Sequence, residues 1–374
     1  QFPTRKTKTW RRERRGLIQG EKVSNPTSDQ SLPKPPKEKV TLVEFDDNHL
    51  LAQLVGEHDR YLARIEQGLN VLVTPRGNKM AITGPSHARL VTKQVLEDLY
   101  ERLKGGLEVT EGEVDAAIRM ASDTPPIEGK RVSVAEKGSM IVTKRRHITP
   151  RSTNQGHYVN SLRNHELVFG LGPAGTGKTY LAVANAVSLL IESKVDRIIL
   201  ARPAVEAGEK LGFLPGDMRD KIDPYLRPLY DALYDMLPAE EVVSRLENGE
   251  IEVAALAFMR GRTLSNAAII LDEAQNTTPV QMKMLLTRMG ENSSMAVTGD
   301  LSQIDLPLGV PSGLKEAVRI LRGVKGIDVI DFGESDVVRH PLVTRIVRAY
   351  GEHDREKKLN LEMKRQQKES ADNS

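Results

Sequence analysis

The chain has 374 residues, enough for roughly two or three domains that each bury a core of their own. Its 39% hydrophobic and 28% charged residues are typical of a globular protein, and its apolar runs fall short of the ~18 residues that span a bilayer, which argues against a membrane protein. The absence of Cys excludes disulfides and thiolate-bound zinc and suits a reducing cytoplasm.

The net charge of +3 conceals a basic first segment. Residues 1–40 contain 11 Lys and Arg against 4 Asp and Glu, a balance of +7, so the other 334 residues sum to −4. Because this segment has few apolar side chains to bury, it is predicted to be a disordered basic tail. The same charges also fit a nucleic-acid-binding arm or, as a third interpretation, an Arg-rich organelle transit peptide.

Residues 41–106 are predicted to form a small α+β domain. Strand-like alternation at 41–45 precedes helical spacing at 48–56 and 59–69, and two strands joined by a turn at 76–78 precede a long amphipathic helix at 86–103. The order β-α-α-β-β-α resembles that of a KH domain, an RNA-binding module that clamps phosphates with a GXXG loop between its first two helices.

In this chain the loop reads Gly56-Glu57-His58-Asp59, with Asp in place of the second glycine. Two carboxylates beside a phosphate repel it, so we expect a KH-like fold that does not bind RNA through this loop. A docking or oligomerisation domain is the competing interpretation.

Residues 107–150 are predicted to be a linker. It contains a short helix at 111–122 and a hairpin at 131–146 that turns at Lys137-Gly138. The hairpin ends in the exposed basic run Lys144-Arg145-Arg146.

Strands and helices alternate from residue 151 to residue 350. This pattern predicts an α/β domain with a parallel sheet covered by helices on both faces. Residues 351–374 are predicted to be a charged tail of balanced sign.

The strongest chemical signal is ELVFGLGPAGTGKTYLAVA, in which an apolar strand runs into G-x-x-x-x-G-K-T and then into a helix. Such glycines let successive backbone N–H groups surround phosphate oxygens, and the helix N-terminus adds partial positive charge. Lys178 is predicted to bridge the β- and γ-phosphates of ATP during catalysis, and the Thr179 hydroxyl is predicted to bind Mg²⁺. The residues predicted to bind ATP are Gly172, Pro173, Ala174, Gly175, Thr176, Gly177, Lys178 and Thr179.

AIILDEAQ, residues 268–275, supplies the second half of this site. Its apolar residues predict a buried central strand, so Asp272 emerges at the carboxyl end, where open α/β sheets bind ligands. Asp272 is predicted to hold Mg²⁺, and Glu273 is predicted to orient and deprotonate the attacking water.

Three further side chains are candidates for contact with the nucleotide. Gln303 follows the strand that ends at Gly299 by about one helical turn, and its carboxamide is predicted to sense the γ-phosphate. Upstream of the phosphate strand, Gln155 is predicted to read the adenine edge and Tyr158 to stack on the base. A Glu that activates water, together with a Gln that contacts the γ-phosphate, favours transfer of the phosphoryl group to water. This pair therefore disfavours a kinase that phosphorylates a small molecule.

Seven blocks of the sequence resemble the PhoH-like P-loop ATPases, densely over about residues 140–350 and more loosely upstream. They are GPAGTGKTYLAVA, RPAVEAGEKLGFLPGD, DPYLRPLYDAL, MRGRTL, DEAQNTT, TGDLSQIDLP and VVRHPLVTRIVRAY. The resemblance implies a cytoplasmic, ATP-binding protein with a RecA-like fold, related to superfamily 1 helicases and linked to RNA metabolism. It also implies an endoribonuclease that matures ribosomal RNA as a partner.

Motors that move on nucleic acid usually carry two ATPase lobes, and the second delivers an arginine to the leaving phosphate. The residues after Thr179 are taken up by one lobe, so we expect a neighbouring subunit to supply this arginine within a homo-oligomeric ring, with a hexamer as the expected form. Arg339 and Arg345 are the first candidates and Arg288 is the next, although the first two also fit salt bridges on a helix surface.

RNA contacts are predicted from basic and aromatic residues in loops after strands. The basic candidates are Arg202, Lys210, Arg260 and Arg262. Phe213 and Phe258 are able to stack on bases, but core packing is the expectation for both.

The sequence therefore predicts an Mg²⁺-dependent ATPase that couples hydrolysis to the remodelling of RNA or a ribonucleoprotein. The alternative is a nucleotide-gated scaffold that docks a ribonuclease without moving along RNA.

Overall fold

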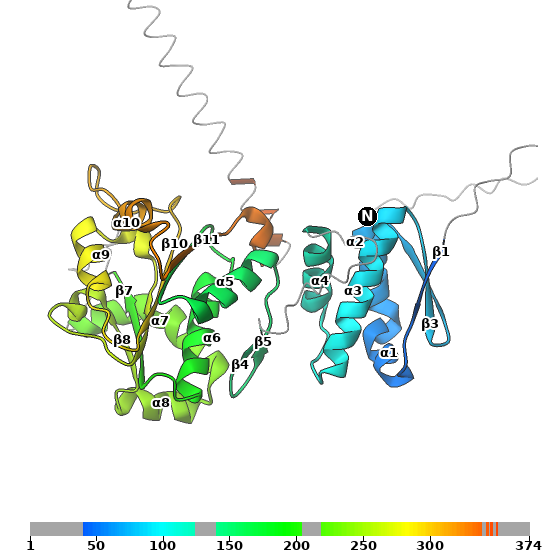
Figure 1. The fold of residues 1–374 in the computed structure, drawn as a ribbon, viewed down its shortest axis with the longest axis horizontal. Helices are drawn as coiled ribbons and strands as arrows, with labels where there is room; N and C mark the ends of the chain where they lie inside the picture. The colour runs from blue at the N-terminus through cyan, green and yellow to red at the C-terminus, as the bar shows by residue number, and fades with distance from the viewer. Residues whose placement is uncertain are drawn as a thin grey trace, which may run out of the picture. The chain divides into compact units, whose positions relative to one another are not determined.

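The computed structural model describes residues 40–123, 140–203 and 218–338, together with residues 342, 343, 345, 346, 349 and 350 (Figure 1). The predicted basic tail, apart from Val40, and the predicted charged tail lie outside these residues. Among the described helices, none combines the length and the apolar character needed to cross a membrane.

The first described segment forms the small α+β unit that the sequence predicts. Its elements are β1 (Val40–Glu44), α1 (Asn48–Val55), α2 (Arg60–Leu69), β2 (Leu72–Arg76), β3 (Lys79–Thr83) and α3 (Ser86–Lys104). The strands pair antiparallel in the order β1-β3-β2. The predicted succession β-α-α-β-β-α is therefore confirmed.

One hydrophobic cluster holds this unit together. Alternate strand residues such as Val43 and Ile82 point into it, and α3 contributes a stripe that includes Val95 and Leu99. The next helix, α4 (Glu111–Asp123), packs against α2 and α3 and adds Val114 to the same cluster. The helix predicted as part of a linker is thus held by this core.

The loop in the GXXG position keeps a left-handed backbone without its second glycine. Gly56 has a φ of 77°, and Asp59 has a φ of 58°. Asp is among the few residues that tolerate this region, so the turn forms even though a carboxylate replaces the glycine. Glu57 and Asp59 are both exposed, which leaves the two negative charges at the tip of the loop.

The hairpin before the α/β domain differs from the predicted one. The predicted turn at Lys137-Gly138 lies outside the described residues. The observed hairpin pairs β4 (Ile141–Val142) with β5 (His147–Ile148), so the basic run forms its turn. Lys144 pairs with Glu241 at 2.7 Å and Arg146 with Asp235 at 2.7 Å. These carboxylates bind the basic run to the α/β domain.

The second part of the chain is the predicted α/β domain. Its elements are α5 (Thr153–Asn164), β6 (Leu167–Leu171), α6 (Lys178–Ile191), β7 (Arg197–Arg202), α7 (Met218–Met236), α8 (Ala239–Glu247), β8 (Ile251–Ala255), β9 (Ala267–Leu271), α9 (Pro279–Leu286), β10 (Ser294–Gly299), α10 (Gly313–Leu321) and β11 (Ile327–Asp331). The six strands are parallel and lie in the order β11-β6-β10-β9-β7-β8.

Hydrophobic clusters fill both faces of this sheet, as predicted. One cluster joins the sheet to α5, α6, α7 and α8, and the other joins it to α9 and α10. Every residue of β6 and of β9 is buried, which explains their continuous apolar sequences. Because the strands are parallel, the carboxyl ends of β6, β10, β9 and β7 meet at one edge of the sheet.

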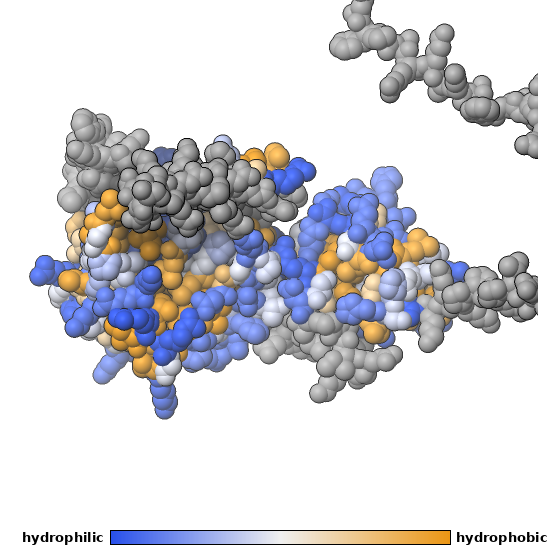
Figure 2. Space-filling model, turned by 90° about the horizontal axis from the view of Figure 1, so that it is seen from above, coloured by the Kyte–Doolittle hydropathy of each residue, from blue (hydrophilic) through white to orange (hydrophobic). Residues whose placement is uncertain are grey.

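The space-filling view shows hydrophilic residues interspersed with separate hydrophobic patches (Figure 2). Large apolar side chains that remain exposed include Leu42 and Leu72 on the small sheet and Val280 and Leu308 in the α/β domain.

Candidate functional site

The phosphate loop connects β6 to α6 at this carboxyl edge. Gly175 and Gly177 have φ values of +87° and +80°, and Gly172 has a φ of +140°. A Cβ on Gly172 would clash with the backbone carbonyl of Phe332, and a Cβ on Gly177 would lie 3.1 Å from Gln155 Nε2. These positions need glycine, and together they form a cradle of the size and polarity that a phosphate requires.

Lys178 begins α6 and turns its ammonium group back into the cradle. Its Nζ donates to the carbonyls of Gly172 at 2.7 Å and Pro173 at 2.8 Å, and its side chain is 8% exposed. A buried cation held by loop carbonyls is a favourable partner for phosphate oxygens. The contact of Lys178 with phosphate stays a prediction.

Thr179 and Asp272 come together although 93 residues separate them. The Thr179 hydroxyl donates to Asp272 Oδ1 at 2.6 Å, and the Thr298 hydroxyl of β10 donates to the same oxygen at 2.8 Å. Asp272 is 6% exposed. A hydroxyl and a carboxylate are hard oxygen ligands, which fit Mg²⁺. No cluster of three His, Asp or Glu that could hold a metal ion occurs among the described residues.

Glu273 lies next to Asp272 with a left-handed backbone, at a φ of 52°. Its Oε1 lies 3.1 Å from Arg202 Nη2, and its Oε2 accepts a hydrogen bond of 2.5 Å from Gln275 Nε2. The carboxylate is therefore held from two sides. A base for the attacking water needs such a fixed position.

Gln303 is placed by Asp300, the residue after β10. Gln303 Nε2 donates to Asp300 Oδ2 at 2.6 Å, while the backbone N–H of Asp300 donates to Gln275 Oε1 at 3.0 Å. Hydrogen bonds thus connect the predicted γ-phosphate sensor to Gln275 and through it to Glu273.

These side chains line one cleft of about 800 Å³. The cleft brings together Lys178, Thr179, Asp272, Glu273 and Gln303 from three separate sequence blocks, with one wall formed by α7. Its volume lies within the range of natural ligand sites. The arrangement is that of a P-loop nucleotide site.

Gln155 does not line this cleft in the structure. Its Nε2 donates to the carbonyl of Thr176 at 2.9 Å, and its Oε1 accepts from the N–H of Arg151 at 2.6 Å. With 4% exposure, the amide fixes the phosphate loop from behind. The predicted reading of the adenine edge would require the amide to leave these partners.

Tyr158 is not placed to stack on a base, which corrects the prediction. Its ring is fully buried beneath β6, where it packs edge-on against Phe332 with ring centroids 5.4 Å apart. Its hydroxyl has no hydrogen-bond partner among the residues that the structure describes, and burial raises its pKa. The spacing that suggested an aromatic ring near the nucleotide is instead the spacing of a core position on α5.

The predicted arginine fingers have different positions. Arg339 lies outside the described residues, and Arg345 is a helical residue with an exposed side chain. Arg288 donates from Nε to the carbonyl of Met284 at 3.2 Å and from Nη1 to that of Arg262 at 3.3 Å, so it closes the end of α9.

The predicted RNA contacts separate into three groups. Lys210 and Phe213 lie outside the described residues. Arg202 lines the nucleotide cleft, and Arg262 forms a bidentate pair with Glu252 at 2.6 and 2.7 Å.

Arg260 and Phe258 remain on the surface. Both follow β8, at the same edge of the sheet as the phosphate loop, and both are exposed. The expectation that Phe258 packs in the core is wrong, because its side chain is 48% exposed.

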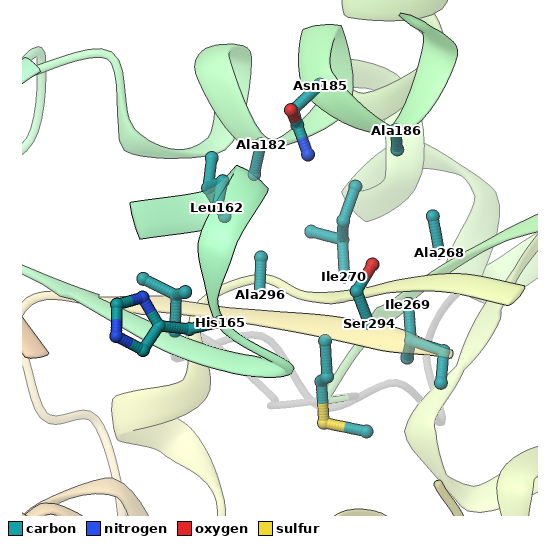
Figure 3. A pocket seen from close by; sticks show the side chains of 12 residues that line it. Leu162, His165, Ala182, Asn185, Ala186, Ala268, Ile269, Ile270, Ser294 and Ala296 are labelled. Atoms are coloured by element: carbon teal, nitrogen blue, oxygen red, sulfur yellow. The ribbon is translucent and has the colours of Figure 1, made fainter. Parts of the chain in front are cut away.

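A second cavity lies between α6 and the strands β9 and β10 (Figure 3). Asn185 points into it from the helix, and Ala268 and Ile270 line it from the sheet. Its volume of about 10 Å³ has room for one water molecule at most, so it is a packing space within the core.

Sequence reasoning missed the contact between Arg202 and the two carboxylates. The signal that was available is the position of Arg202 at the end of the apolar strand RIILAR, which predicts an arginine at the ligand-binding edge. What the sequence did not contain is the strand order that makes β7 the neighbour of β9.

Comparison with known proteins identifies relatives of the whole domain. The family model described as PhoH-like protein matches residues 147–351. A PhoH-like protein of Bacillus subtilis is 49% identical over 297 residues, which cover 79% of this chain and 92% of that protein. A PhoH-like protein of Mycobacterium tuberculosis is 47% identical over 307 residues, covering 82% and 86%.

Other matches are narrower. Protein PhoH of Escherichia coli is 47% identical over 205 residues, which cover 54% of this chain and 58% of that protein. Among solved structures, the Pif1 helicase of Candida albicans aligns with 48% of this chain and 39% of its own, at 12% identity and a TM-score of 0.25. A likeness at that score carries no argument about function.

Proposed function

The chain belongs to the PhoH-like protein family, and from this premise we propose that it is an Mg²⁺-dependent ATPase that acts on RNA or on ribonucleoproteins. The observation that carries the ATPase proposal is the pairing of Thr179 with Asp272 at 2.6 Å in the cleft that Lys178 and Glu273 also line. The phosphate-binding, Mg²⁺-binding and water-activating parts of a P-loop hydrolase then each have a residue of suitable chemistry.

The proposed roles follow from these positions. Lys178 and the N–H groups of the loop bind the β- and γ-phosphates, while Thr179 and Asp272 would hold Mg²⁺. The ion would neutralise phosphate charge there. Glu273 accepts a proton from the water that attacks the γ-phosphorus, and the bond to the bridging oxygen of ADP breaks.

Two substitutions test this assignment. Lys178→Ala is expected to abolish nucleotide binding, because no other ammonium lines the described part of the loop. Glu273→Gln is expected to bind ATP and hold it without turnover. Binding is measured with a fluorescent ATP analogue and turnover by phosphate release, and rapid turnover by Glu273→Gln would remove Glu273 from its role.

Support for RNA as the partner comes from Phe258 and Arg260. An exposed aromatic ring beside an exposed guanidinium suits single-stranded nucleic acid, since the ring stacks on bases and the cation contacts phosphates. RNA is expected to stimulate ATP turnover, and Phe258→Ala and Arg260→Ala are expected to reduce the stimulation while basal turnover stays unchanged. Turnover that is indifferent to RNA in the unaltered protein would contradict RNA coupling.

The scaffold alternative rests on the loop of the first domain. Exposed Glu57 and Asp59 occupy the place where a KH domain binds phosphate, which favours a protein partner there. Under this alternative, ATP binding controls docking of a ribonuclease. An endoribonuclease that binds the ATP-held Glu273→Gln protein and not the ADP-bound protein, without any effect of RNA on turnover, would favour the scaffold.

We also propose that subunits assemble next to the nucleotide. The loop between β10 and α10, residues 300–312, carries Gln303 and exposes Leu301, Ile304, Leu308 and Val310. Hydrogen bonds fix it: Asp305 N–H donates to Asn276 at 2.8 Å, and Ser312 donates to the carbonyl of Gln275 at 2.8 Å. An apolar surface on the loop that carries Gln303 is suited to a second copy of the chain, as a ring requires.

A further inference from the structure

Arg202 is the last residue of β7 and reaches both carboxylates of the cleft. Its Nη2 lies 3.1 Å from Glu273 Oε1, and its Nε lies 3.9 Å from Asp272 Oδ2. The backbone fixes this position, because β7 pairs in parallel with β9 and the N–H of Asp272 donates to the carbonyl of Ala201 at 2.9 Å. Arg202 is therefore built into the edge of the sheet beside Asp272.

The same contact places Arg202 close to where the γ-phosphate would lie. Glu273 is the proposed base for a water that attacks the γ-phosphorus, and a water bound to it lies about 3 Å away. A guanidinium 3.1 Å from that carboxylate is then within the length of one side chain of the phosphate. The Arg202 side chain is 20% exposed and lines the cleft, so a nucleotide in the cleft can reach it.

The position of Arg202 matters because the described lining of the cleft has more acidic than cationic side chains. The described lining contains the acidic side chains of Asp231, Asp235, Asp272, Glu273 and Asp300, and its cationic side chains are those of Lys178 and Arg202. Lys178 begins α6 on the phosphate loop, whereas Arg202 ends a different strand. A phosphoryl group that leaves ADP spreads negative charge over its equatorial oxygens, and a fixed guanidinium is the side chain best suited to stabilise it.

We propose that Arg202 is a catalytic residue that contacts the γ-phosphate in cis and stabilises the charge that develops during ATP cleavage. The contact with Glu273 holds the guanidinium ready before the nucleotide binds. This inference rests on the proposed ATPase function. It gives the chain a phosphate-stabilising arginine of its own, whether or not a neighbouring subunit adds another.

The first test uses Arg202→Gln, which keeps the length and polarity of the side chain and removes its charge. Loss of an arginine of this kind lowers the turnover number by roughly a thousandfold or more. We expect this loss in kcat with little change in the KM for ATP or in the affinity for Mg²⁺·ADP. Arg202→Lys retains the positive charge but lacks the planar guanidinium. Its kcat is therefore expected to lie between that of Arg202→Gln and that of the unaltered protein.

Arg245→Gln is the matched control. Arg245 lies on α8, is 19% exposed, and pairs with Glu241 at 2.7 Å, so it resembles Arg202 in burial and partner but lies outside the cleft. Its removal is expected to leave kcat unchanged. Thermal unfolding of all variants with Mg²⁺·ADP checks that the fold is intact.

The second readout does not depend on turnover. Aluminium fluoride with Mg²⁺·ADP imitates the transferring phosphoryl group, and the trapped complex is measured by retention of labelled ADP. The unaltered protein and Arg245→Gln are expected to trap ADP, whereas Arg202→Gln is expected to bind ADP without trapping it. Trapping by Arg202→Gln equal to that of the unaltered protein would overturn the proposal.

Mixing experiments separate action in cis from action in trans. If Arg202 acts within its own subunit, a mixture of Arg202→Gln and Glu273→Gln proteins contains no intact site and stays inactive. Recovery of turnover in that mixture would show that Arg202 serves a neighbour. An unaltered protein without any ATP turnover would instead contradict the ATPase function itself, which keeps the two failures distinguishable.

Discussion

Gln155 illustrates how a single buried side chain prepares the nucleotide site. Its amide accepts from the N–H of Arg151 and donates to the carbonyl of Thr176, so it joins the start of α5 to the phosphate loop. A buried amide that loses such partners costs about 1–3 kcal/mol. Gln155 therefore sets the curvature of the loop before any nucleotide arrives.

Replacement of Gln155 by Leu tests this role. We expect the affinities for ATP and GTP to fall together by about tenfold, because about 1.4 kcal/mol of loop organisation is lost whichever base is present. Titration with fluorescent ATP and GTP analogues measures both affinities, with the exposed Gln53→Leu as control. A fall for ATP alone would support the original prediction that Gln155 reads adenine.

At the scale of elements, the phosphate loop depends on close contact with the chain after β11. Gly172 has a φ of +140°, and a Cβ there would meet Phe332 Cβ at 2.8 Å as well as the Phe332 carbonyl. Gly249, between α8 and β8, has a φ of +74°, and no atom of the described residues lies within 4 Å of a Cβ there. The two glycines share a left-handed backbone and differ in their surroundings.

These two positions form a matched pair of substitutions. Gly249→Ala is expected to lower the free energy of unfolding by about 1–2 kcal/mol, which is the cost of a Cβ on a left-handed backbone without any clash. Gly172→Ala is expected to lose a further 1–3 kcal/mol or so through the clash and to lose ATP affinity. Urea unfolding and nucleotide titration measure both, and equal losses at the two positions would contradict the close contact.

Tyr180 joins α6 to α7 at the cleft. Its hydroxyl donates to Asp235 Oδ2 at 2.7 Å, and Asp235 also pairs with Arg146 of the hairpin. Burial, followed by the hydrogen bond to Asp235, raises the pKa of Tyr180 from 10.0 to about 12. Deprotonation of the phenol would therefore remove this hydrogen bond between the two helices.

This shift predicts the pH dependence of stability. Because the folded-state pKa is raised, the contribution of Tyr180 is complete below pH 10 and is lost as the pH rises toward 12. The difference in unfolding temperature between the unaltered protein and Tyr180→Phe should therefore shift in favour of Phe over that range. A difference that does not change with pH would show that the hydroxyl is not held as described.

At the scale of the whole molecule, the proposed assembly depends on the apolar surface of the loop 300–312. Three sequence blocks meet at the carboxyl edge of the large sheet, and the loop 300–312 presents apolar side chains beside them. Leu308 is fully exposed and Val280, on α9, is 79% exposed. Apolar groups on a rigid loop lose little conformational entropy when a partner covers them, which favours an interface.

Leu308→Asp tests assembly at this surface. We expect the molar mass measured by light scattering with Mg²⁺·ATP to fall, while the unfolding temperature changes little because Leu308 packs against nothing in the described chain. Val243→Asp, at an exposed position on α8, is the control. An unchanged mass for Leu308→Asp would exclude this loop from the interface.

Several features could be predicted from local sequence because their causes are local. Periodicity predicted the elements of the small domain and the alternation of the large one, and the glycine spacing with Lys178 and Thr179 predicted the phosphate loop. Tyr158 shows where this reasoning ends. An aromatic residue on an amphipathic helix has the same pattern whether it faces a ligand or the core, and only packing against Phe332 decides between them.

The sequence by itself determined the fold class, the family and the residues that can bind a nucleotide, because strand and helix periods and the backbone freedom of glycine act within a few residues. The tertiary structure decided which distant side chains meet. The order β6-β10-β9-β7 places Thr179 on Asp272 and Arg202 on Glu273. The packing of α5 against α6 and β6 places Gln155 on the loop. These contacts depend on strand order and burial, which arise only when the whole chain packs.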